Sequence, residues 1–290
     1  MTMRLRTILY ISLMAMVVGI SALSAAEITV NASRAIQSCS DVNFRIEGRA
    51  AVVAEERISV GGNLLAVRLG ESQGFPLKVV GSDRSGYEVI LCKGASDDSV
   101  LSQIRLQQTG ETVTVAGPAR SDWSGHVIVL APRDGDLEIE ATNGPVSISD
   151  LAGRLKATVA NGPLSLKRVG GSVEVESRNG PVSFTGGSGD VSLTSKNGPL
   201  TINLEGSSWE GGELRTSAKN GPVTVRVPQG YASGLVLERG ARTPLRCPAA
   251  LCGERPEFFR DNQTRIEIGH AMPRVHVAAM NGPVTIKQAD

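Results

Sequence analysis

Apolar and polar residues alternate along much of the second half of the chain. Leu137, Ile139 and Ala141 alternate with Glu138 and Glu140, for example. A period of two places the apolar side chains on one face of a β-strand. Beyond residue 26, no long stretch has the apolar spacing of an amphipathic helix. The pattern predicts an all-β fold.

This alternation is arranged in a repeat marked by the tripeptide Asn-Gly-Pro. The first four copies are evenly spaced along the chain, and the last two follow after longer intervals. Aliphatic residues resume directly after each copy, as in Val146-Ser147-Ile148. Each unit is therefore predicted to form a strand, a corner, a second strand and a second corner. The corner asparagines are Asn143, Asn161, Asn179, Asn197, Asn220 and Asn281.

Two architectures fit such a unit. In one, Asn-Gly forms the tight turn of a β-hairpin. In the other, each eighteen-residue unit is one coil of a β-solenoid. Proline directly after glycine disfavours the hairpin, because it restricts the preceding residue and removes a hydrogen-bond donor where the second strand starts. So short a unit also cannot bury its apolar face alone, whereas stacked units share one core. We therefore predict a β-solenoid.

The repeated asparagine is predicted to have a structural role at the corner. It shares the parity of the buried residues, so its side chain is expected to point inward. A buried amide needs hydrogen-bond partners, and stacked asparagines provide them for one another. The glycine that follows adopts backbone angles closed to other residues. A ligand-binding role for the motif is the alternative.

Residues 1–26 are predicted to be a cleaved signal peptide. They have a basic start at Arg4 and Arg6, an apolar stretch, and small residues up to Ala26, which is typical of such a segment. A retained membrane anchor is the alternative. The apolar stretch is short for that role, because a bilayer span takes about 20 residues.

The rest of the chain is predicted to have two parts. Residues 27–133 show less regular alternation and are expected to be an irregular β-rich part. Residues 134–290 are expected to be the β-solenoid. Within it, a proline-rich segment at about 243–272 is predicted to be a loop excursion from the stack.

Four cysteines are present: Cys39, Cys92, Cys247 and Cys252. An even number in an exported chain indicates disulfides. Cys247 and Cys252 are close in sequence, so a local bridge between them is our first choice among three possible pairings, which leaves Cys39 with Cys92. A zinc site is the alternative, weakened because no histidine or Cys-x-x-Cys pair stands nearby.

The charge balance narrows the possible partners. Lys and Arg total 30, and Asp and Glu total 29. There is no basic excess to suit nucleic acid and no acidic tail. No second apolar run is long enough to span a membrane. We therefore expect no nucleic-acid partner and no membrane span once the signal is removed.

Three segments together resemble a bacterial putative-adhesin family of exported β-strand-repeat proteins, a domain of unknown function. They are the Asn-Gly-Pro-Val-Ser-Ile repeats, Trp209-Glu210-Gly211-Gly212-Glu213-Leu214, and Val227-Pro228-Gln229-Gly230-Tyr231. The resemblance covers about Asp122 to Asp290 well and the earlier part loosely. It implies a β-solenoid at the cell envelope, without enzyme activity or catalytic residues.

The residues themselves also predict no catalytic site, no metal and no cofactor. Glu138 and Glu174 would lie two coils apart with Lys156 between them, which predicts a solvated face of mixed charge rather than a converging carboxylate pair. No histidine stands at metal-ligand spacing. No serine stands in a Gly-x-Ser-x-Gly elbow.

A regular column of hydroxyl side chains is the one candidate binding face. It consists of Ser147, Ser165, Ser183, Thr201, Thr224 and Thr285. Such a column on a flat sheet is suited to carbohydrate or ordered water. The strand propensity of these residues explains it more simply.

We expect an exported protein of the periplasm or cell surface with a structural or adhesive role. Its partner would be a surface, a glycan or an envelope protein. A carbohydrate-active β-helix enzyme is one alternative, and a periplasmic sensory or partner-binding module is another.

Overall fold

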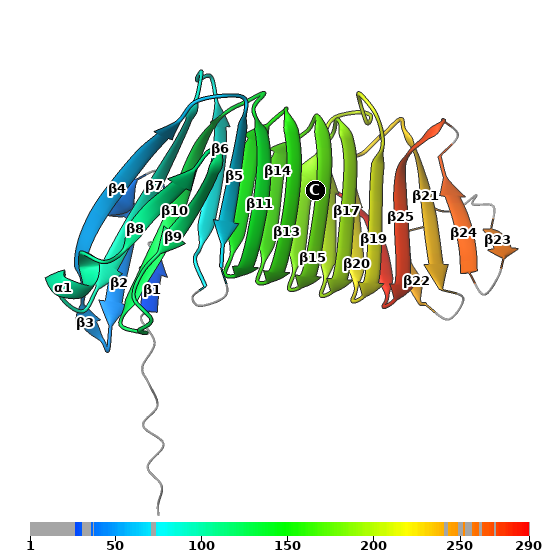
Figure 1. Ribbon diagram of the computed structural model, residues 1–290. Helices are drawn as coiled ribbons and strands as arrows, with labels where there is room; N and C mark the ends of the chain where they lie inside the picture. The colour runs from blue at the N-terminus through cyan, green and yellow to red at the C-terminus, as the bar shows by residue number, and fades with distance from the viewer. Residues whose placement is uncertain are drawn as a thin grey trace, which may run out of the picture.

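Each Asn-Gly-Pro unit contributes two strands, one to each of two large sheets that face each other (Figure 1). The computed structural model describes residues 27–30, 36, 38–70, 74–240, 243–248, 252, 257–260, 263–269 and 271–289. In the first unit, β11 (Asp136–Asn143) ends at the asparagine and β12 (Val146–Leu151) begins after the proline. The predicted all-β fold is confirmed. The predicted signal peptide lies outside the described residues.

The later units repeat this arrangement. They are β13 (Arg154–Asn161) with β14 (Leu164–Val169), β15 (Ser172–Asn179) with β16 (Val182–Gly186), β17 (Asp190–Asn197) with β18 (Leu200–Leu204), β19 (Leu214–Asn220) with β20 (Val223–Val227), and β25 (Pro273–Asn281) with β26 (Val284–Gln288). Each strand pairs in parallel with the equivalent strand of the next unit. Asn-Gly therefore joins strands of different sheets, which excludes the hairpin.

The core lies between the two sheets. Leu137, Ile139 and Ala141 of β11 are each at most 3% exposed, because the alternation turns them away from solvent. Equivalent residues of neighbouring units stand beside them, as in the pairing of Leu137 with Leu155. The result is one continuous apolar cluster that runs the length of the stack. No unit could bury this surface alone.

The corner asparagines form a ladder of side-chain hydrogen bonds. Each Nδ2 donates to the Oδ1 of the preceding asparagine, at 3.0 Å from Asn161 to Asn143 and 2.9 Å from Asn179 to Asn161. The ladder continues through Asn197 and Asn220 to Asn281. Each amide side chain therefore satisfies the next along the edge of the stack.

The prediction that these asparagines point inward is wrong. Asn143 is half-buried and the other five are exposed. Alternation breaks just before the asparagine, since the register passes from the pair Ala141–Val159 directly to Asn143–Asn161. Two consecutive residues, such as Lys196 and Asn197, then face outward. This break lets the chain bend, and the amides meet on the outside of the corner.

The glycine after each asparagine is required by close approach of the backbone. Gly180 has a φ of +133°, a conformation that L side chains rarely adopt. A Cβ there would also overlap the carbonyl oxygen of Gly162 in the preceding unit. Its N–H meanwhile donates to the Asn197 carbonyl oxygen at 2.9 Å. Glycine thus lets neighbouring units pair at hydrogen-bonding distance at their corners.

The N-terminal part extends both sheets with less regular strands. β6 (Leu77–Ser82) pairs in parallel with β12 and with β10 (Trp123–Pro132). Antiparallel pairing then adds β7 (Tyr87–Ala95) and β4 (Val52–Val60). In the other sheet, β5 (Leu64–Leu69) continues from β11, followed by β9 (Thr112–Ala116) and β8 (Arg105–Thr109). The short helix α1 is Asp98–Leu101.

A small third sheet covers the outer face of β7 and β10. It consists of β1 (Glu27–Val30), β2 (Val42–Ile46) and β3 (Arg49–Ala50), and a 3-10 turn, η1 (Cys39–Asp41), leads into β2. Val42 and Phe44 pack there against Ile90, Cys92 and Ile128. The predicted disulfide Cys39–Cys92 ties this layer to β7.

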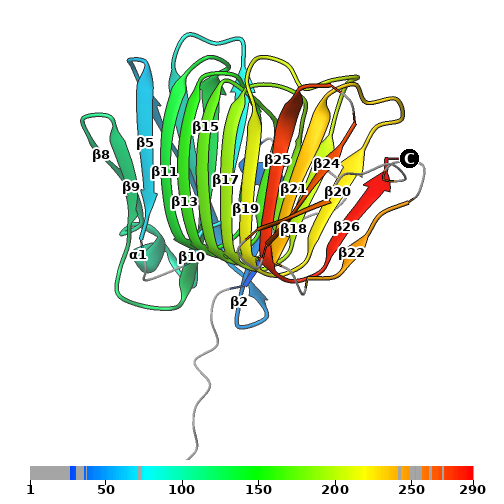
Figure 2. The same cartoon turned by 90° about the vertical axis from the view of Figure 1, so that its right-hand side faces the viewer.

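The C-terminal strands are not in chain order. β25 lies between β19 and β21 (Gly234–Gly240) (Figure 2). Beyond β21, antiparallel pairing adds β24 (Gln263–Ile268) and β23 (Glu257–Arg260), and β22 (Leu245–Arg246) extends the other sheet beside β26. The first strand of the last unit, β25, is therefore inserted between β19 of the preceding unit and β21, which belongs to the segment that interrupts the repeat.

The segment predicted as a loop excursion at about 243–272 is therefore partly strand. Ile266 is fully buried in the shared core, so this segment covers the end of the stack rather than leaving it. The predicted bridge Cys247–Cys252 is present within it. Within the described residues, no helix is long and apolar enough to cross a membrane.

The amide ladder leads to a testable prediction. Asn179→Ala removes one bond donated to Asn161 and one accepted from Asn197. We expect it to lower the free energy of unfolding, measured in urea, by about 1–2 kcal/mol. Asn281→Ala removes one bond, to Asn220, and should cost about half as much.

The matched control is Thr194→Ala. Thr194 is exposed on the same sheet, just before the corner pair Lys196 and Asn197. This change should stay within about 0.5 kcal/mol of wild type. Equal losses in Asn179→Ala and Thr194→Ala would contradict a stabilising ladder.

Candidate functional site

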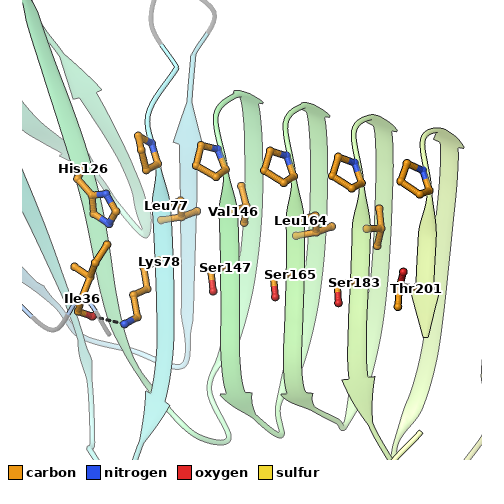
Figure 3. A pocket seen from close by; sticks show the side chains of 16 residues that line it. Ile36, Leu77, Lys78, His126, Val146, Ser147, Leu164, Ser165, Ser183 and Thr201 are labelled. Carbon is orange, nitrogen blue, oxygen red and sulfur yellow. Dashed lines mark hydrogen bonds between the residues drawn. The ribbon is translucent and has the colours of Figure 1, made fainter. Parts of the chain in front are cut away.

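An elongated groove crosses the outer face of the 11-stranded sheet. Its volume is about 730 Å³, and its lining comes from β10, β6, β12, β14, β16 and β18, strands that neighbour one another in the sheet. Figure 3 shows two rows of side chains that cross these strands side by side, one of prolines and one of hydroxyl residues. The groove follows the stacking direction rather than any single strand.

The first row consists of proline rings. They are Pro76, Pro145, Pro163, Pro181 and Pro199. Each proline precedes an inward aliphatic residue, as Pro145 precedes Val146, so its own ring faces outward. The proline carbonyls still accept hydrogen bonds within the sheet. The Val146 N–H, for example, donates to Pro163 O at 2.9 Å. The row is an apolar strip at the start of each strand.

The second row contains four members of the predicted hydroxyl column. Ser147, Ser165, Ser183 and Thr201 line the groove. In-register pairing places them on adjacent strands, about 4.8 Å apart. Within the described part of the chain, none of the four hydroxyls has a hydrogen-bond partner. Each is free to donate one bond and accept two.

The other two members of the column lie beyond the groove. Thr224 pairs with Thr201, and Thr285 pairs with Thr224. Both continue the row on β20 and β26, but neither lines the groove.

His126 takes the place of a proline at one end of the groove. It precedes Val127, which pairs with Leu77, and therefore stands level with Pro76. Its side chain lines the groove yet is only 3% exposed, and neither imidazole nitrogen has a hydrogen-bond partner. Burial, with a smaller contribution from the nearby Lys78 charge, lowers the pKa of His126 to about 4. The imidazole is therefore neutral at pH 7.

Lys78 takes the place of a serine at the same end. It pairs with Ser147 across β6 and β12. Its Nζ donates to the Ile36 carbonyl oxygen (Figure 3), and burial lowers its pKa. Ile36 packs against the apolar cluster beneath the small third sheet. That layer closes the groove at this end, whereas the other end continues toward β20.

The site was only partly visible in the sequence. The hydroxyl column follows from the repeat, but His126 and Lys78 were missed. A signal was present, since Pro76-Leu77-Lys78-Val79 has the pattern of Pro163-Leu164-Ser165-Leu166 without the preceding asparagine. Its place in the stack depends on pairing between β6 and β12, far apart in sequence.

The remaining predicted residues do not line the groove. The outer face of the other sheet carries mixed charges, with Glu138 paired to Lys156 and Lys156 to Glu174, as expected. Cys39–Cys92 anchors the covering layer, and Cys247–Cys252 lies at the far end of the stack. In the described ranges, no group of three or more His, Cys, Asp and Glu side chains is placed to hold a metal ion.

Comparisons with known proteins give distant structural likenesses. No family model matches the chain, and no curated protein matches it. A putative cell adhesion protein from Clostridium sporogenes is 11% identical, with a TM-score of 0.36, over 82% of this chain and 100% of that one.

A putative adhesin from Bacteroides fragilis has the same identity, 11%, and TM-score, 0.36, over 82% of this chain and 97% of its own. A putative lipid binding protein from Parabacteroides distasonis is 8% identical, with a TM-score of 0.27, over 82% and 97% of the two chains. The adhesin names agree with the family that the sequence resembles. Likenesses of this size establish neither membership nor function.

The buried imidazole gives a testable pH dependence. Its folded pKa of about 4 lies below the ordinary value of 6.5, so the unfolded chain binds a proton that the folded chain does not. The contribution of His126 to stability is therefore lost progressively as pH falls from about 6.5 toward 4. Relative to pH 8, the loss at pH 5 should be about 2 kcal/mol.

Urea unfolding of wild type and His126→Phe at both pH values measures this loss. The variant should lack this component while retaining the rest of the acid dependence. An imidazole NMR titration of His126 near its ordinary value would contradict the assignment.

Proposed function

We propose that this chain is an exported, non-catalytic binding protein of the bacterial cell envelope, in which a β-solenoid presents the groove to a ligand. The parallel stacking of 18-residue units, with an asparagine ladder at one corner, supports the solenoid. Two disulfides support an oxidising compartment outside the cytosol. The Asn-Gly-Pro motif is structural, and function belongs to the face beside it.

The observation that carries the proposal is the polar atoms left without partners in the groove. Buried polar groups in folded proteins are nearly always hydrogen-bonded, yet both nitrogens of His126 lack partners. Four hydroxyls stand free in a row beside it. Both nitrogens are closed to solvent, so the partners that a ligand lying across the strands would supply directly are those of the hydroxyl row.

The lining also supports binding rather than catalysis. Glycoside hydrolysis, the chemistry considered for a β-helix, ordinarily needs two carboxylates at the bond that breaks. Among the described residues that line the groove, none is aspartate or glutamate, and His126 and Lys78 are its titratable side chains.

Blocking the groove tests this function. We expect the double variant Ser165→Trp/Ser183→Trp to fill the middle of the groove. The probes are neutral and acidic soluble polysaccharides, vesicles of phosphatidylcholine with phosphatidylglycerol, and proline-rich and mixed-sequence peptides. At least one class should bind wild type in calorimetry, and the double variant should weaken that binding at least tenfold.

Thr285→Trp is the matched control, because Thr285 continues the same row outside the groove. It should bind as wild type does. Polysaccharides incubated with the protein should release no reducing ends. The function is excluded if no probe binds, or if the blocked variant binds as tightly as wild type.

A further inference from the structure

We propose that the groove binds a linear acidic polysaccharide, with successive sugar rings over successive strands and an anionic group at the end formed by Lys78 and His126. This inference rests on the proposed function and names the class of ligand.

The spacing of the rows favours a chain of sugar rings over a peptide. Adjacent strands present equivalent side chains about 4.8 Å apart, because the units pair in register. A pyranose ring in a linear chain advances it by about this distance. An extended peptide repeats the same face about every 6.8 Å, so its side chains would fall out of step with the rows.

The chemistry of each strand favours sugar over an acyl chain. Each of β12, β14, β16 and β18 presents one proline ring beside one free hydroxyl. A pyranose ring has an apolar C–H face and a rim of hydroxyls, which match this pair. An acyl chain would cover the protein hydroxyls and leave them without partners, which is unfavourable.

The end of the groove at Lys78 and His126 favours an anionic group of the ligand. Lys78 is the cationic side chain of the described lining, and no carboxylate lines the groove with it. Asp41, whose charge acts on Lys78, is itself bonded to Ser38. A ligand carboxylate beside Nζ would be held by charge.

Figure 3 places Lys78 and His126 at one end of the hydroxyl row, with Ile36 beside them. The covering layer ends the groove there. The hydroxyl row continues in register to Thr224 on β20 at the other end. The anionic residue would therefore sit against the wall while the rest of the chain runs outward over β18 and β20.

Two oligosaccharides that differ only in charge test this assignment. The probes are a linear oligogalacturonate and its fully methyl-esterified form, titrated calorimetrically into the intact protein. The acid should bind at least tenfold more tightly than the ester. Lys78→Gln, which keeps a donor for the Ile36 carbonyl, should weaken binding of the acid by about tenfold and leave binding of the ester unchanged.

Lys167→Gln is the matched charge control, because Lys167 is exposed on β14 outside the groove. It should bind both probes as wild type does. Ser165→Ala/Ser183→Ala should weaken both probes to a similar extent, about fivefold for each hydrogen bond lost. Unfolding midpoints of all variants should match wild type, so that loss of binding is not loss of fold.

Equal binding of acid and ester, or no effect of Lys78→Gln, would overturn the acidic assignment. Vesicles or peptides that bind in the groove while both sugars fail would overturn the ligand class and leave the groove as a binding site. If none of the probes binds in a groove-dependent way, this inference and the proposed function both fail.

Discussion

In-register parallel pairing between identical units is the constraint on which the rest of the structure depends. It places Leu137 beside Leu155 and Asn143 beside Asn161, so each side chain meets its own equivalent in the next unit. A slip of one residue would turn every aliphatic side chain outward. The same slip would break the amide ladder. The aliphatic core and the asparagine ladder therefore both favour the same register.

The groove depends on the same register and on the point where the repeat ends. Along β12 to β18, identical units give a uniform surface of proline rings and hydroxyls. At β6 and β10, lysine replaces serine and histidine replaces proline, without any change in pairing. The regular array supplies length, and its irregular neighbour supplies charge and polarity. Neither part would form this surface alone.

Much of the fold could be predicted from the sequence because the repeat determines it. The alternation gave the strands, Asn-Gly-Pro gave the corners between them, and the spacing of cysteines favoured the pairing found in the structure. The hydroxyl column could be predicted as a row because it shares one position of the unit. The orientation of the asparagines could not, since alternation fails where the strand bends. The prediction assumed that the alternation of inward and outward side chains continues as far as the asparagine.

The site was harder to predict for a different reason. His126 and Lys78 belong to strands that join the stack through pairing distant in sequence, and their local patterns lack the asparagine that marks a unit. The strands of the segment at about 243–272 were missed similarly. β22 pairs with β26, and β24 reaches the sheet through β21, which pairs with β25. Both β25 and β26 follow the segment in the chain, so nothing local in the segment reveals its place.

The insertion of β25 between β19 and β21 has a consequence for the order in which the strands can assemble. Among the described strands, β21 joins the stack through β25 and β22 joins it through β26. The strands from β21 to β24 therefore cannot dock on the stack until β25 and β26 have been made. The units from β11 to β20 need no later residue. A chain that folds as it is made would therefore complete the end of the stack near β21 last.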